Sequence, residues 1–198
     1  MAAPHRIVRL KVTLDGVEPR VERWLVAPLN IRLDRLHLTL QAAMGWSDGH
    51  LWEFRAGDAG WGVPDPEYGF GDGPLDARKT TLQQALKHTG ARRLKYLYDF
   101  GDGWAHTVKL DKFSDFAVDI DAPFLVEAWG RCPPEDCGGP WGYADLLAAY
   151  ADPGHEDHDA AIEALGAGYD PTVAPTRKLY DAVNALMLQW TPKPRAPR

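Results

Sequence analysis

The residues with the most evident chemistry lie in one short stretch, residues 96–106, where two carboxylates and an imidazole surround a Gly-Asp-Gly turn. Apolar, strand-forming residues flank this turn, which predicts a β-hairpin with Asp99 and Asp102 at its tip and His106 on the returning strand. Carboxylate oxygens and imidazole nitrogens are ligands for divalent cations, so these three residues form a candidate metal site. An alternative stays open, in which the aspartates accept backbone N–H groups of the turn and His106, on the same strand face as Trp104, lies in the core.

A second acid-bearing loop, residues 132–139, follows further along the chain. Two prolines precede Glu135 and Asp136 and two glycines follow Cys137, so the loop is stiff on one side and free to adopt unusual backbone angles on the other. These acids could cap the next helix or pair with a cation, or the loop could only hold the sheet against the helices. We predict that this loop and the hairpin tip line one cleft. We also expect His50 to join His106 if their strands are neighbours. The candidate binding residues are His50, Asp99, Asp102, Trp104, His106, Glu135 and Asp136.

The two cysteines do not extend this site to a zinc finger. Cys132 and Cys137 are followed by His155 and His158, and neither the gap between the pairs nor the gap between the histidines fits a finger. In a reducing compartment free thiols are expected. No Gly-x-Ser-x-Gly motif of a nucleophilic serine is present. No organic cofactor is predicted, and the cofactor that the candidate residues could take is a divalent metal.

The elements that must position these residues follow from apolar periodicity and from turn residues. Strands dominate residues 1–130 and helices dominate 141–190, which predicts one α+β domain over 1–190, with a flexible, basic, Pro-rich tail at 191–198. On the first helix, His37 falls on the apolar stripe, where a hydrogen-bonded core histidine is expected. The predicted strands are 6–14, 21–27, 50–56, 93–100, 104–111 and 123–129, with one short strand at 67–70 inside a long loop at 57–78. The predicted helices run from an Asn30 cap to Gly45, from a Thr81 cap to before Gly90, and over 143–151, 155–165 and 176–190.

Charge limits the classes of partner. The 198 residues carry a net charge of −6, and residues 96–170 hold sixteen acids against three bases. Residues 78–95 hold six cations and no acid. A sequence pI near 5.6 argues against nucleic-acid binding. The acidic block suits simple solubility first, and otherwise a metal or a cationic partner. No apolar run is long enough to span a membrane, and we expect a cytoplasmic protein.

Three stretches, residues 36–54, 98–106 and 132–143, together closely resemble the plasmid-pRiA-type ORF-three-like family. Members of this family are often labelled transposable-element passenger or TnpR proteins. The resemblance implies an α+β fold with a curved, mostly antiparallel sheet, an N-terminal helix and a helical C-terminal layer. It does not imply a serine resolvase, because Ser47 and Ser114 are the two serines of the chain and each stands beside an aspartate, outside any basic patch.

The leading hypothesis is therefore a non-catalytic binding or accessory module, linked to mobile elements, that takes a protein, a peptide or a basic ligand. The alternative is a metal-dependent, hydrolase-like enzyme. That enzyme would hold a divalent cation with Asp99, Asp102, His106, Glu135 and Asp136.

Overall fold

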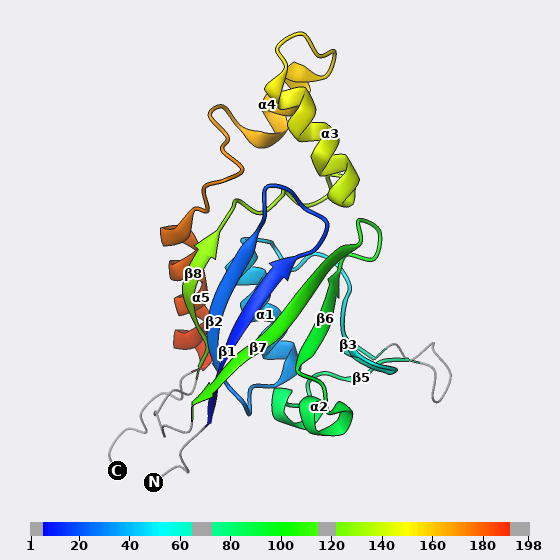
Figure 1. Ribbon diagram of the computed structural model, residues 1–198, viewed down its shortest axis with the longest axis vertical. Helices are drawn as coiled ribbons and strands as arrows, with labels where there is room; N and C mark the ends of the chain where they lie inside the picture. The colour runs from blue at the N-terminus through cyan, green and yellow to red at the C-terminus, as the bar shows by residue number, and fades with distance from the viewer. Residues whose placement is uncertain (1–5, 65–72, 115–121, 191–198) are drawn as a thin grey trace.

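The structure, a computed structural model, describes residues 6–64, 73–114 and 122–190. Within these residues the chain has the predicted α+β architecture, with an open, mostly antiparallel sheet of eight strands and five helices (Figure 1). The strands are β1 (Ile7–Leu14), β2 (Glu22–Pro28), β3 (Trp52–Ala56), β4 (Ala59–Gly62), β5 (Leu75–Asp76), β6 (Arg93–Tyr98), β7 (Trp104–Ser114) and β8 (Phe124–Trp129). The helices are α1 (Leu33–Met44), α2 (Leu82–Thr89), α3 (Gly139–Ala151), α4 (His158–Leu165) and α5 (Thr176–Trp190). None of the helices in the described ranges is long and apolar enough to cross a membrane.

The order of the strands brings three loops to one end of the sheet. The order is β5-β4-β3-β6-β7-β1-β2-β8, and β4 with β5 is the parallel pair among antiparallel neighbours. Trp52 pairs with Tyr98, which pairs in turn with Trp104, so the start of β3 lies beside the turn between β6 and β7. β8 ends at this same end of the sheet, where Trp129 pairs with Glu22 of β2 (Figure 1).

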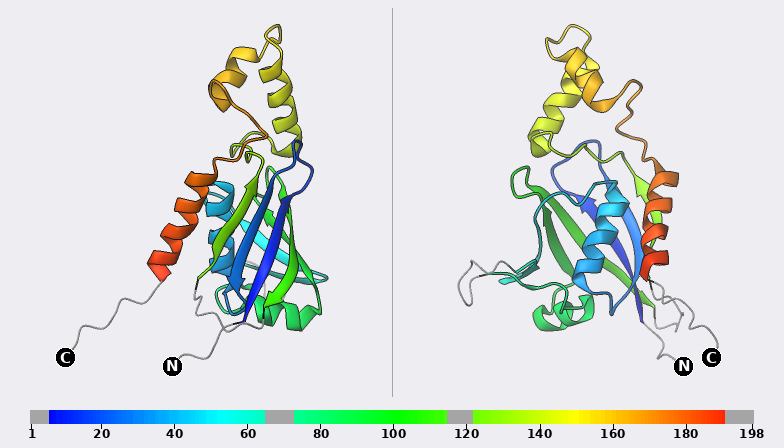
Figure 2. Two further views of the ribbon diagram at one scale, coloured as in Figure 1. Left: turned by 60° about the vertical axis from the view of Figure 1, so that its left-hand side comes forward. Right: turned by 180° about the vertical axis from the view of Figure 1, so that it is seen from behind.

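One face of the sheet carries the core, because successive side chains of a strand point to opposite faces. In β1 the buried residues alternate with partly exposed ones, and the buried residues are Val8, Leu10, Val12 and Leu14. α1 covers this face, and α5 packs beside α1 and against β8 (Figure 2). The sheet and these two helices form the body of the molecule.

His37 lies on the buried stripe of α1, as the sequence predicts. Its side chain is almost fully buried, with Nδ1 2.8 Å from the Tyr96 hydroxyl and Nε2 2.6 Å from Asp48 Oδ1. The imidazole also stacks on Trp52 at a centroid distance of 3.9 Å. Burial lowers the pKa of His37, and the neighbouring Asp48 carboxylate opposes that shift.

The two helix starts predicted from caps had different outcomes. Thr81 caps α2 in a reciprocal capping box with Gln84, and this prediction is confirmed. The Asn30 cap is wrong, because α1 begins after Arg32. The preceding residue, Ile31, is buried and its carbonyl accepts a hydrogen bond from the start of α2, which delays the helix.

Several other boundaries also differ from the sequence prediction. The stretch 57–78, predicted to be mostly loop, contains β4 and β5; β4 forms because the buried Trp61 pairs with Phe54. The short strand predicted at 67–70 lies outside the described residues. β3 begins at residue 52 rather than 50, α3 at 139 rather than 143, and α4 at 158 rather than 155.

Residues 131–175, here called the acidic head, project from the end of the sheet and include α3 and α4 (Figures 1 and 2). The Arg131 N–H donates to the Pro171 carbonyl at 2.8 Å, so the two ends of this segment are tied together. Within it, the Tyr143 and Tyr169 hydroxyls lie 2.9 Å apart. The head is thus closed by its own contacts and meets the body at the end that carries the three loops.

Candidate functional site

Three loops meet at the end of the sheet. They are residues 45–51 after α1, the 99–103 turn between β6 and β7, and residues 130–138 between β8 and α3. The Trp46 indole N–H donates to the Pro133 carbonyl at 2.9 Å, which fixes the first loop to the third. Trp46 also stacks on Tyr98 at 5.1 Å, and so closes the end of the core beneath the loops.

Glu135 is the polar centre of this junction. One carboxylate oxygen accepts the Ser47 backbone N–H at 2.8 Å, and the other accepts the Tyr98 hydroxyl at 2.5 Å. The Tyr98 oxygen in turn accepts the Gly49 N–H at 3.0 Å. Burial and the neighbouring Glu135 carboxylate raise the pKa of Tyr98 well above its ordinary value, so the hydroxyl stays protonated and donating. Glu135 therefore holds the loops together.

Asp102 and two glycines join the second loop to the third. Asp102 Oδ2 accepts the Gly138 N–H at 3.2 Å. A Cβ on Gly139, whose φ is +69°, would lie 2.1 Å from the Asp102 carbonyl oxygen. Only glycine allows this approach between the turn and the first residue of α3.

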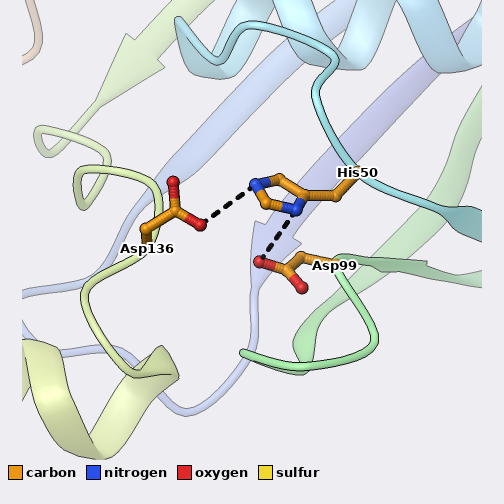
Figure 3. A group of neighbouring side chains, drawn as sticks. All are labelled: His50, Asp99 and Asp136. Atoms are coloured by element: carbon orange, nitrogen blue, oxygen red, sulfur yellow. Dashed lines mark ion pairs between the residues drawn. The ribbon is translucent and has the colours of Figure 1, made fainter.

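A histidine lies between two carboxylates where the three loops converge (Figure 3). His50 Nδ1 is 3.6 Å from Asp99 Oδ2, and His50 Nε2 is 3.2 Å from Asp136 Oδ1. Each residue offers one potential ligand atom, and these atoms lie within 4.8 Å of one another. Asp99 is nearly buried and uses its other oxygen, Oδ1, to accept the Gly101 and Asp102 N–H groups. The group thus combines a fixed carboxylate with a solvent-exposed one, Asp136.

Backbone strain is concentrated in the same loops. Asp48, Asp99 and Asp136, with φ of 62°, 56° and 58°, are the non-glycine residues that have positive φ in the described part of the chain. This left-handed conformation costs a residue with a side chain about 1–2 kcal/mol, less for aspartate, and such residues often occur at functional sites. One strained aspartate lies in each of the three loops.

The structure places the predicted site residues Trp104 and His106 in the core. Both are fully buried, and the His106 ring contacts Trp46 edge-on at 5.4 Å. His106 Nδ1 is 3.1 Å from the Trp104 carbonyl oxygen, and burial lowers the pKa of His106 to about 4. Strand alternation turns His106 toward α1, away from the turn, so Asp99, Asp102 and His106 are not brought together. The described group with metal-binding spacing is His50, Asp99 and Asp136.

The acidic head adds an open hollow beside this group. The hollow has a volume of about 860 Å³ and lies between the third loop and helices α3 and α4. The carboxylates that line it are Glu135, Asp136, Asp145 and Asp157, and the alanines of α3 and α4 supply much of the rest. The whole head, residues 131–175, holds nine acids and a single base, Arg131. Arg131 lies against the Tyr169 ring at 4.9 Å.

The cysteines are free thiols, as predicted, and both are partly buried. Desolvation raises the pKa of Cys132 to about 12 and that of Cys137 to about 11. His158 Nδ1 lies 2.8 Å from the Ala149 carbonyl oxygen, and His155 Nδ1 accepts the Asp157 N–H. Among the described residues, neither thiol belongs to a group of three metal-ligating side chains.

Sequence reasoning missed Tyr98 and Arg23, which hold the site. Tyr98 lies in the hairpin sequence, but nothing local shows that its hydroxyl would bond Glu135. Arg23 is fully buried on β2, and its guanidinium donates to the carbonyls of Trp129 and Gly130 at the start of the third loop. No local signal distinguishes it from an exposed arginine of a strand.

Comparison with known proteins gives relatives over nearly the whole chain. A family model described as plasmid pRiA4b ORF-3-like protein matches residues 6–178. A relative from Sinorhizobium fredii (strain NBRC 101917 / NGR234), described as uncharacterized protein y4hQ, is 53% identical over 190 residues, covering 96% of both chains. A crystal structure of a protein of unknown function, MM3350 from Methanosarcina mazei Go1, matches with a TM-score of 0.74 and 28% identity, over 86% of this chain and 96% of that one. These descriptions state no activity or ligand that could be transferred.

Proposed function

The chain belongs to the plasmid pRiA4b ORF-3-like family, and we propose that it is a non-catalytic binding module whose acidic head receives a basic segment of a partner protein. The observation that carries this proposal is the charge of the head, nine acids against one base, around an open hollow lined by four carboxylates.

The lining of the hollow suits lysine and arginine side chains. Asp145 and Asp157 are exposed, and among the described residues no Lys or Arg pairs with either of them; Asp157 Oδ2 lies 3.9 Å from His155 Nδ1. A surface of one sign raises the local concentration of oppositely charged ligands and speeds their association. Between the carboxylates, the alanines of α3 and α4 offer apolar surface on which the aliphatic stems of Lys and Arg can lie.

An accessory role for a mobile element is the finer part of the proposal. The plasmid in the family description supports it, and so does the absence from the hollow of the basic residues that contact with DNA would require. The partner would then be a basic protein encoded by the same element. The alternative, a metal-dependent hydrolase, stays a prediction, and its cation would have to be held by His50, Asp99 and Asp136, because His106 is buried.

The test is a calorimetric titration of the full chain with a synthetic decapeptide of alternating Arg and Ala. The titration is done at low salt and again at physiological salt. We expect saturable one-to-one binding that weakens as salt is added, because salt screens the attraction between exposed carboxylates and the arginines of the peptide. The double substitution Asp145→Asn with Asp157→Asn should weaken binding by about two- to thirtyfold, at about 0.2–1 kcal/mol for each of two exposed pairs.

A matched control is available on the same helical pair. Asp159→Asn with Glu163→Gln removes the same charge from exposed residues that do not line the hollow, and it should change the affinity by less than about twofold. Equal losses in the two double variants would mean that the peptide senses only net charge. That result, or no saturable binding, would refute a binding site in the hollow.

A further inference from the structure

We propose that His50, Asp99 and Asp136 bind one divalent cation of the zinc class, and that this cation ties the three loops together. This inference concerns a site that shares Asp136 with the edge of the hollow, and it does not depend on the binding of a basic partner. It rests on the ligand types, on their spacing and on the state of the Asp99 carboxylate.

The spacing of the three residues suits a small cation. With zinc–ligand distances of about 2.0–2.2 Å, two ligand atoms on a tetrahedral zinc lie about 3.4 Å apart. The separations of 3.6 and 3.2 Å join Asp99 to His50 Nδ1 and Asp136 to His50 Nε2, so they belong to different ring nitrogens. With one nitrogen as the ligand, the three ligand atoms lie within 4.8 Å of one another, and one ion would draw them closer together. The Asp136 side chain is 75% exposed, so it is the ligand that is free to move.

The Asp99 carboxylate has one oxygen left over for a ligand. The residue is 8% exposed, and its Oδ1 is occupied by two backbone N–H groups of the turn. Among the described residues no hydrogen bond reaches Oδ2, which points at His50 across 3.6 Å, beyond hydrogen-bond length. Oδ2 is therefore the Asp99 oxygen that a cation could bind without breaking the hydrogen bonds of the turn.

The ligand types select the kind of cation. One imidazole nitrogen with two carboxylate oxygens fits Zn²⁺ and similar transition ions, whereas Mg²⁺ and Ca²⁺ prefer oxygen ligands throughout. Two carboxylates with a neutral imidazole carry a charge of −2, which a divalent cation neutralises. The group is open on the side of the exposed Asp136, so water or a group from a partner could complete the coordination.

Each ligand comes from a different loop, so the cation would act as a cross-link. His50 precedes β3, Asp99 follows β6, and Asp136 leads into α3 and the acidic head. Within the described residues, the side-chain hydrogen bonds between these loops run through Trp46, Glu135 and Asp102. A bound cation would add a direct link between the body and the head and stabilise the folded chain by mass action.

The test is calorimetric titration of the full chain with Zn²⁺, after removal of metals by a chelator, together with thermal unfolding with and without Zn²⁺. We expect one ion per chain and a rise in the unfolding temperature. Since the loss even of a metal-orienting partner typically costs 10–100-fold in affinity, His50→Ala and Asp99→Asn should each weaken binding by at least about tenfold. Asn at position 99 keeps an oxygen for the turn N–H groups and tolerates a positive φ, so that variant should still fold.

His155→Ala and Asp157→Asn are matched controls, because these residues form an exposed His–Asp pair at 3.9 Å outside the group. Both should bind Zn²⁺ as the unaltered chain does. Zinc binding that survives His50→Ala would assign the ion to other residues, such as the thiols, and would overturn the proposal. So would the absence of saturable Zn²⁺ binding, or equal competition by Mg²⁺, which indicates oxygen ligands only. The basic-peptide titration of His50→Ala separates the two proposals, since the loss of zinc should leave the hollow intact.

Discussion

The body and the acidic head use charged residues in opposite ways. In the body, Arg23 is fully buried and its guanidinium donates to four backbone carbonyls, while no carboxylate of the described residues forms an ion pair with it. In the head, Asp145 and Asp157 are exposed, and no described Lys or Arg pairs with them. A buried charge must be bonded or the fold loses its stability, whereas an exposed and unpaired one contributes little to stability and remains available to a partner. The comparison separates the residues that hold the three loops from those that could recognise a ligand.

The largest expected effect is that of Arg23→Met in the body. The substitution leaves the carbonyls of Ala43, Trp129 and Gly130 without their donor, and we expect a loss of about 3–5 kcal/mol of unfolding free energy. Urea unfolding measures it. Arg177→Met, at a side chain 90% exposed, is the matched control and should cost less than about 0.5 kcal/mol. If Arg23→Met and Arg177→Met lost similar amounts of unfolding free energy, buried and exposed charges would not differ in their contribution to stability.

The next effect is the pH dependence of stability that arises from buried histidines in the body. Burial holds the pKa of His106 at about 4, against an ordinary value of 6.5. Between these values the unfolded chain takes up a proton and the folded chain does not, so stability is full above about pH 6.5 and falls as the pH drops toward 4. At 1.36 kcal/mol per pK unit, the loss is up to about 3 kcal/mol. The pKa of His37 is also lowered, and His37 adds in the same direction.

Urea unfolding from pH 7 to pH 4 checks this expectation. His106→Leu should flatten the slope in part and leave the contribution of His37. A slope that is the same in His106→Leu and in the unaltered chain would show that His106 does not titrate as its burial implies.

A medium effect is expected at the junction between the two regions. Gly139→Ala puts a Cβ 2.1 Å from the Asp102 carbonyl oxygen at a φ of +69°, which forces the turn and the third loop apart. We expect a loss of about 2–3 kcal/mol, of which about 1 kcal/mol is the left-handed backbone alone. Gly90→Ala has a similar φ of +65° and nothing within 4 Å, so it isolates the backbone cost. Urea unfolding measures both variants. If Gly139→Ala and Gly90→Ala lose the same unfolding free energy, the contact between residue 139 and the Asp102 carbonyl adjusts without strain.

The smallest effect on stability is expected in the head. Asp145→Asn with Asp157→Asn should change the unfolding free energy by less than about 0.5 kcal/mol, although it weakens binding of the basic peptide. The same urea experiment measures it, with Asp159→Asn and Glu163→Gln as the control pair. A loss above about 1 kcal/mol would mean that these carboxylates hold the head together, as Arg23 holds the body.

Sequence patterns predicted helices and strands well where residues adjacent in the sequence determine the conformation. The helix over 176–190 and the capping box at Thr81 were predicted and occur as such, because apolar spacing and capping are properties of a few adjacent residues. The cap at Asn30 failed because a contact with the start of α2, distant in sequence, holds Ile31 outside the helix. The start of α3 was placed late because the left-handed Gly138 and the contact of Gly139 with Asp102 cannot be read from composition.

The sequence by itself determined the α+β architecture, the buried position of His37 and the acidic character of residues 131–175, since periodicity and composition specify each of them. Only the tertiary structure decided which side chains meet. The adjacency of β3, β6 and β7 puts His50 beside Asp99, and the third loop brings in Asp136, while strand alternation turns His106 into the core. The physical reason is that convergence depends on strand order and on contacts between loops far apart in the chain, and no local pattern encodes these.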